Sequence, residues 1–128
     1  SVRKMISRVR MWCSVEDDLR PWAEIGEEGR GHLLAQLLHG NVYSIPSCEL
    51  ALETARKAMA DKSYVEDLGF FDDVALYFAN GRVQIEHVIA EYGVLDIEAE
   101  KLERLLSQWL RVVTSQEPIE LLLEIELV

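Results

Sequence analysis

Residues 74–89 read VALYFANGRVQIEHVI, two alternating apolar segments joined by Asn80-Gly81. Asn and Gly both tolerate the positive φ that a two-residue type I′ turn requires at its central positions. The turn therefore predicts a β-hairpin of known register. Three pairs then share its inner face: Phe78–Val83, Leu76–Ile85 and Val74–His87. The outer face carries the more polar set: Tyr77, Ala75, Gln84 and Glu86.

Apolar residues also alternate near both ends of the chain, which predicts one strand at each end. The apolar sets are Val9, Met11, Cys13 and Val15 in the first strand, and Ile119, Leu121, Leu123, Ile125 and Leu127 in the last. Their polar faces are opposite in charge: Arg8 and Arg10 in the first, Glu120, Glu124 and Glu126 in the last. Opposite charges across strands contribute roughly 0.2–1 kcal/mol per pair, so we expect the two strands to be antiparallel neighbours.

Helical periodicity appears between these strands. One helix is expected from a cap at Pro46-Ser47 to about Lys62, and a shorter one from about Gly31 to His39. A third is capped by Asp96. The apolar faces are Cys48, Leu52, Ala55 and Met59 in the first of these, and Leu102, Leu105, Leu106, Trp109, Leu110 and Val113 in the third. Residues 16–29, with six acids, are expected to form an acidic loop.

The order of these elements is β-α(α)-β-β-α-β over a single domain, residues 1–128. It predicts an α+β fold in which one four-stranded antiparallel sheet packs its helices on one face. In the ferredoxin-like version of this order, the first and last strands are antiparallel neighbours. The alternative is a sheet of the same elements in another order.

The charge of the chain is strongly asymmetric. It has 23 acidic and 13 basic residues, a formal net of −10. Four of the bases lie in the first ten residues, so 23 acids and 9 bases remain from residue 11 onward, a net of −14. This charge argues against nucleic acid or an anionic membrane as partner and favours a basic protein. No apolar run approaches the length of a membrane-spanning helix, and no signal peptide is expected. Two cysteines are too few for a disulfide framework, so we expect reduced thiols in a cytoplasmic protein.

Two acidic segments carry aromatic residues that could anchor a partner. In residues 16–28 the candidate contacts are Asp17, Asp18, Trp22, Glu27 and Glu28. In residues 64–73 they are Glu66, Asp67, Phe70, Asp72 and Asp73. Aromatic anchors supply much of the binding energy of an interface, and complementary charge raises the association rate. The alternative is that both segments are solvated loops, with Phe70 or Phe71 packed in the core.

No motif for catalysis, a cofactor or a metal is apparent, so neither enzyme activity nor a cofactor is expected. His32 and His39 are seven residues apart, about 10 Å along a helix, which is too far for one zinc ion. His87 on the inner hairpin face is expected to be a hydrogen-bonded core histidine. The other functional reading is a small-molecule regulatory domain of ACT-like topology, with Gly26, Gly29 and Gly31 in its ligand loop.

A small, acidic, cysteine-poor α+β chain with a central hairpin and no catalytic motif resembles bacterial immunity proteins, including those of contact-dependent growth-inhibition systems. The resemblance is one of overall character and transfers no individual residue. It implies that the chain binds a cognate toxin domain, often a basic nuclease, and blocks its active site. Oligomeric state is left open.

Overall fold

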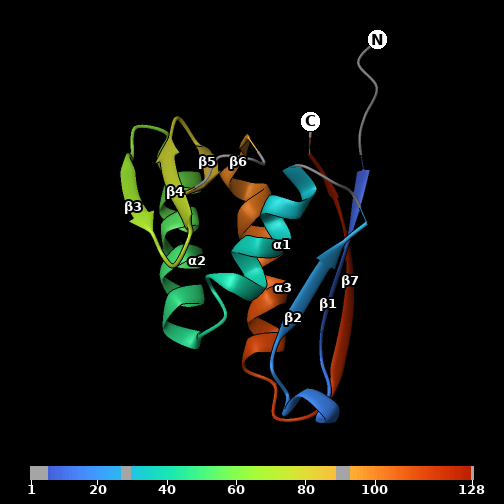
Figure 1. Cartoon of the computed structure of the whole chain (residues 1–128). Helices are drawn as coiled ribbons and strands as arrows, with labels where there is room; N and C mark the ends of the chain where they lie inside the picture. The colour runs from blue at the N-terminus through green and yellow to red at the C-terminus, as the bar shows by residue number, and fades with distance from the viewer. Residues whose placement is uncertain (1–5, 27–29, 89–92, 128) are drawn as a thin grey trace.

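Two antiparallel sheets enclose a layer of helices in the computed structural model, which describes residues 6–26, 30–88 and 93–127 (Figure 1). The elements are, in chain order, β1 (Ile6–Cys13), the 3-10 turn η1 (Val15–Asp17), β2 (Trp22–Ile25), α1 (Arg30–Gly40), α2 (Ile45–Ala60), β3 (Glu66–Phe70), β4 (Val74–Ala79), β5 (Arg82–His87), β6 (Val94–Glu98), α3 (Ala99–Val113) and β7 (Ile119–Glu126). Helix α3 contacts both sheets, so each sheet has one face turned to the helices.

The hairpin is confirmed in register and turn. Strands β4 and β5 pair with Phe78 opposite Val83, Leu76 opposite Ile85 and Val74 opposite His87. Asn80 and Gly81 have φ of 56° and 74°, as the turn type requires. The inner residues of these pairs are buried, while Tyr77, Gln84 and Glu86 are exposed.

The expected pairing of the end strands is also confirmed. Strand β1 runs antiparallel to β7, with Arg8 directly opposite Glu124. Their side chains form an ion pair of 3.3 Å, and Arg10 pairs with Glu120 at 3.1 Å. The hydrogen bond to Glu120 raises the pKa of Arg10. The strand is shorter than expected, because Val15 lies in the exposed turn η1 and not on the buried face.

The sheet organisation differs from the prediction of one four-stranded sheet. The end strands belong to a three-stranded sheet of order β2-β1-β7, and the hairpin to a four-stranded sheet of order β3-β4-β5-β6. Fold class α+β with antiparallel sheets is confirmed; the ferredoxin-like order is not. Three short strands, β2, β3 and β6, had no clear signal, because each has only four or five residues, one or two of them acidic.

The helices occur where periodicity placed them, but their caps differ. Ser44 caps α2 in a capping box with Ser47, one turn before the expected start. Asp96 does not cap α3; it lies in β6 and pairs with Arg82 at 2.7 Å. The position before α3 is Glu98, whose side chain makes no capping bond. The residues of the expected apolar faces are buried or half-buried, with the exception of Met59. Met59 is exposed, and its neighbour Ala58 is buried in the core.

The core lies between the sheets and centres on Trp109 of α3, which is fully buried. Its indole Nε1 donates to the carbonyl of Val42 at 2.8 Å, which ties α3 to the segment that joins α1 and α2. Cys13 and Cys48 are buried free thiols, and burial raises the pKa of Cys48 to about 12. In the described part of the chain, no helix has the length and apolar character needed to cross a membrane.

Replacing Trp109 with Phe should lower the free energy of unfolding by about 2 kcal/mol, because the Val42 carbonyl loses its donor and a small cavity forms. Urea unfolding measures the change. Tyr77→Phe is the matched control: it also removes one polar group from an aromatic residue, but an exposed one, and should change stability by less than about 0.5 kcal/mol. Equal effects of the two substitutions would contradict the role assigned to the Trp109 bond.

Candidate protein-binding site

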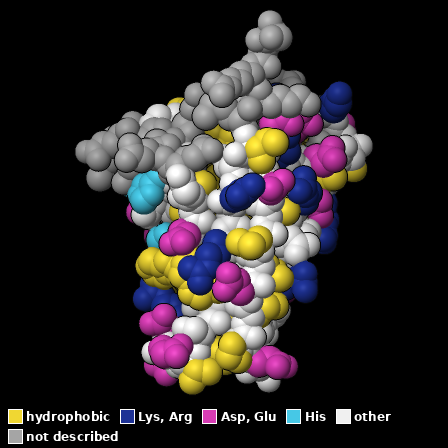
Figure 2. Space-filling model, turned by 90° about the vertical axis from the view of Figure 1, so that its right-hand side faces the viewer, with side chains coloured by type: hydrophobic (Ala, Val, Ile, Leu, Met, Phe, Trp, Pro, Cys, Tyr) yellow, Lys and Arg dark blue, Asp and Glu magenta, His cyan; other side chains and the backbone are white. Residues whose placement is uncertain are grey.

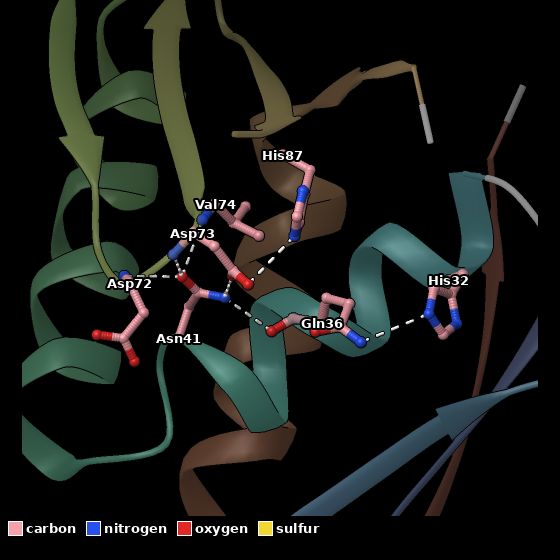
Figure 3. A network of polar contacts seen from close by, with 7 residues as sticks. All are labelled: His32, Gln36, Asn41, Asp72, Asp73, Val74 and His87. Atoms are coloured by element: carbon pink, nitrogen blue, oxygen red, sulfur yellow. Dashed lines mark hydrogen bonds and ion pairs between the residues drawn. The ribbon is translucent and has the colours of Figure 1, made fainter. Parts of the chain in front are cut away.

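The side chain of Asn41 organises the centre of the molecule (Figure 3). It follows directly after α1 and is only 4% exposed. Its Oδ1 accepts from the backbone N–H groups of Asp72, Asp73 and Val74, each at 2.9 Å. Its Nδ2 donates to the carbonyl of Gln36 at 2.9 Å and to Asp73 Oδ1 at 2.7 Å. One carboxamide therefore fastens the end of α1 to the turn between β3 and β4.

Asp73 extends this cluster to the hairpin. Its Oδ2 lies 3.1 Å from Nε2 of His87, the residue that pairs with Val74 across β4 and β5. His87 is 8% exposed, which confirms the expected core histidine. Both oxygens of Asp73 thus have partners inside the protein, although the side chain is 39% exposed. Asp73 is a structural residue that positions the turn, and Asp72 beside it is the exposed carboxylate.

Strand β2 meets the same end of α1 through Trp22. The indole stacks on His39 with ring centroids 4.2 Å apart and planes 15° from parallel. Burial lowers the pKa of the half-buried His39, and the charges of Arg20 and His32 lower it further, against an opposing effect of Asp73. Burial and the two neighbouring cations therefore disfavour the protonated form of His39.

A hollow of about 230 Å³ opens beside this stack, lined by Trp12, Asp17, Arg20 and Trp22. The two tryptophans are directly opposite each other in β1 and β2. Trp22 is 37% exposed and Trp12 half-buried. Figure 2 shows this side of the molecule, where acidic, basic and hydrophobic side chains are interspersed over the three-stranded sheet. We call the four lining residues the tryptophan hollow.

Guanidinium groups already lie on both indole rings. Arg10 is 4.1 Å from the ring centroid of Trp12, and Arg20 is 5.7 Å from that of Trp22. Cations are attracted to indole faces by the ring quadrupole. Asp17 adds a carboxylate beside these guanidinium groups, so the tryptophan hollow combines two aromatic faces with one acidic and one basic lining residue, Asp17 and Arg20.

The structure separates the two segments that the sequence proposed as contacts. The first segment lies at the three-stranded sheet. Asp17 is the last residue of η1, Asp18 follows directly after η1, and Trp22 is the first residue of β2. Glu66, Asp67 and Phe70 lie in β3, at the edge of the other sheet, and Asp72 and Asp73 in the turn that follows. Glu27 and Glu28 fall outside the described residues, as does the side chain of Phe70. The expectation of a single acidic loop over residues 16–29 is corrected, because residues 22–25 form β2.

The segments do approach each other through the last turn of α1. Trp22 contacts His39, and two residues later Asn41 holds the turn that contains Asp72. Phe71 packs against the core, as one of the two phenylalanines was expected to do. Glu66 is half-buried, and Asp67 is exposed with Oδ1 accepting from the N–H of Gly69 at 2.8 Å. Sequence reasoning missed Trp12, Arg20, His39 and Asn41 as members of the site.

Metal chemistry finds no support among the described residues, where no group of three or more His, Cys, Asp or Glu could hold an ion. His32 faces Gln36, with Nε2 atoms 3.4 Å apart, on the helix that also carries His39 (Figure 3). His32 therefore has a polar side chain of its own helix as a neighbour.

Comparisons with known proteins return nothing for this chain: no family model matches it, and neither a curated protein nor a solved structure does.

Asn41→Ala should lower the free energy of unfolding by about 3 kcal/mol, because three backbone N–H groups and the Asp73 carboxylate lose a partner inside the protein. Chemical denaturation measures the loss. Gln116→Ala, which shortens an exposed amide, is the control and should be close to neutral. A loss under about 1 kcal/mol for Asn41→Ala would contradict the central role of this side chain.

The lowered pKa of His39 predicts a pH dependence of stability. Below the ordinary value of 6.5 the unfolded chain binds a proton that the folded chain binds less well, so His39 contributes a loss of stability as pH falls through that range. We expect the free energy of unfolding to fall more steeply between pH 7.5 and about 5.5 in the parent than in His39→Gln. Parallel curves for the two proteins would show that His39 titrates normally.

Proposed function

We propose that this chain is a non-catalytic protein-binding module that recognises a basic partner. Specifically, we propose a cytoplasmic immunity-type inhibitor that binds a toxin domain and occludes its active site. The toxin class that we propose is a nuclease. The observation that carries the proposal is the tryptophan hollow: two opposed indoles, with the carboxylate of Asp17 and the guanidinium of Arg20 beside them, at the surface of a chain with net charge −10.

The indoles have the features of interface anchors. Tryptophan is enriched among the residues that dominate binding energy, and its rigid ring loses little entropy on binding. The stack on His39 holds Trp22 in place before a partner arrives. Pre-organisation of this kind lowers the cost of association.

The chemistry of the hollow suits a lysine or arginine side chain. Arg10 and Arg20 lie over the same rings from within the chain, which supports the view that these faces accept cations. A partner cation could stack on Trp22 where the exposed Arg20 now lies, with Asp17 as its counter-charge. A nuclease exposes such cations, because it binds phosphate.

The acidic turn between β3 and β4 offers a second contact area. Asp72 in this turn and Asp67 in β3 are exposed, and Asp73 holds the turn through Asn41 and His87. Surface carboxylates raise the association rate with a basic protein more than they raise affinity. We therefore assign steering to these acids and anchoring to the tryptophans.

The small-molecule alternative, a regulatory domain, stays a prediction, although the strands form two sheets and not the single sheet of an ACT-like topology. Gly26 lines an open hollow with Ile6, Arg8 and Glu124, and a Cβ added there would meet no atom within 4 Å. Thermal unfolding with amino acids and nucleotides tests this reading, since a ligand at about 100 times its dissociation constant adds roughly 2.7 kcal/mol of stability.

The proposal predicts that a gene directly upstream encodes a toxin with a basic C-terminal domain. Trp22→Ala should weaken binding to that domain by about thirtyfold or more, since anchor tryptophans contribute about 2 kcal/mol or more. Surface plasmon resonance measures affinity, and a nuclease assay measures inhibition. Tyr77→Ala removes an exposed aromatic residue from the other sheet and should leave both unchanged.

Salt separates steering from anchoring in the same experiment. The association rate should fall steeply between about 20 mM and 150 mM salt, where the Debye length shrinks to about 8 Å, and the Asp72→Lys variant should lose part of that dependence. A rate independent of salt would overturn the charge-steered mechanism. An upstream gene without a basic C-terminal domain would contradict the immunity proposal.

A further inference from the structure

The outer strand β7 is the longest edge strand of the described structure. It has eight residues and lies last in the order β2-β1-β7, so among the described residues it is paired on one side only. An edge strand presents unpaired backbone N–H and C=O groups that can take up another strand. The free edge of β7 could therefore pair with an extended segment of another chain.

The other edges are less suitable. Strand β3 is interrupted by an irregularity between Asp67 and Gly69, where Gly69 has φ of 64°. Strand β2 has four residues and packs along α1, and β6 has five residues and runs directly into α3. Short or irregular edges resist strand addition, so β7 is the regular edge of useful length.

The side chains of β7 are incompletely covered on both faces. On the helix side, Ile119, Leu121 and Leu123 are only half-buried, although they pack against the core. On the outer side, Leu122 is 73% exposed between Glu120 and Glu124. An added strand with apolar residues at every second position would cover more of both rows.

The charge of β7 selects the partner. Its outer row holds Glu120, Glu124 and Glu126, of which the first two have side chains 53% and 62% exposed. A second copy of β7 in antiparallel pairing would bring glutamates beside glutamates, which is destabilising. A segment with Lys or Arg at alternate positions would meet these acids instead.

Strand β1 demonstrates this chemistry on the other side of β7. There Arg8 and Arg10 pair with Glu124 and Glu120, while the residues between them face the core. A further guanidinium, from Arg104 of α3, donates to the carbonyl of Glu124 at 2.8 Å. Both carboxylates and the Glu124 carbonyl therefore already have arginine partners within the chain, and an added basic strand would share these acceptors with Arg8, Arg10 and Arg104.

From this we infer that the free edge of β7 binds an extended segment of the basic partner, in which Lys or Arg alternates with apolar residues, as a fourth strand. The inference rests on the proposed function only for the charge of the partner. It adds a recognition mode, main-chain pairing with alternate side-chain contacts, that is separate from the tryptophan hollow.

An eight-residue peptide that alternates Arg and Val is the probe, and one that alternates Glu and Val is its control. We expect the basic peptide to bind the full chain at low salt and the acidic peptide not to bind. Bound peptide should slow hydrogen exchange at every second amide of β7, since alternate residues point to the free edge. Binding without protection in β7, or no binding of the basic peptide, would overturn the inference.

Leu122→Lys tests the site without removing an internal ion pair, because Leu122 is exposed. The added charge should weaken binding of the basic peptide by about tenfold through repulsion. Val65→Lys makes the same change at an exposed valine outside this sheet and should have little effect. Equal effects of the two substitutions on peptide binding would overturn the inference. So would a dimer of the parent chain, seen in sedimentation, that the Leu122→Lys variant no longer forms. Inhibition of the toxin and its dependence on Trp22 are measured without the peptide, so failure of one proposal is distinguishable from failure of the other.

Discussion

The buried carboxamide of Asn41 is the contact on which the arrangement of the layers depends. It joins the end of α1 to three successive backbone N–H groups of the β3–β4 turn, and through Asp73 it reaches His87 of the hairpin. Unpaired polar groups are costly inside a protein, so loss of one member leaves the others without partners and destabilises the cluster. It therefore fixes where the four-stranded sheet lies relative to the helices.

The same cluster decides which acids are available to a partner. Asp72 and Asp73 are adjacent in sequence and identical in chemistry, yet Asp73 has partners on both oxygens while Asp72 is exposed. On the other sheet, Arg8 and Arg10 of β1 give Glu124 and Glu120 of β7 partners within the chain, although both carboxylates stay largely exposed. Net charge alone does not distinguish these roles, because it does not depend on position.

Local patterns were predictable where their physical cause is local. The hairpin followed from the backbone preference of Asn80-Gly81 and from alternation, both of which act within a few residues. The end strands followed from alternation and complementary charge. Strands β2, β3 and β6 did not, since short strands take their conformation from the neighbours they pair with. Asn41 was not predictable as a member of the site, because its five hydrogen bonds join residues up to 33 positions apart.

The amino-acid order alone thus establishes an acidic α+β chain, the register of its hairpin, and the antiparallel pairing of its two ends. Each depends on turn preference, side-chain alternation or charge, which can be evaluated along the chain. Packing decides that the strands form two sheets with helices between them, that Trp12 and Trp22 share one hollow, and that Asp73 faces inward. Those outcomes depend on which distant segments bury one another's surfaces, and burial is a property of the whole fold.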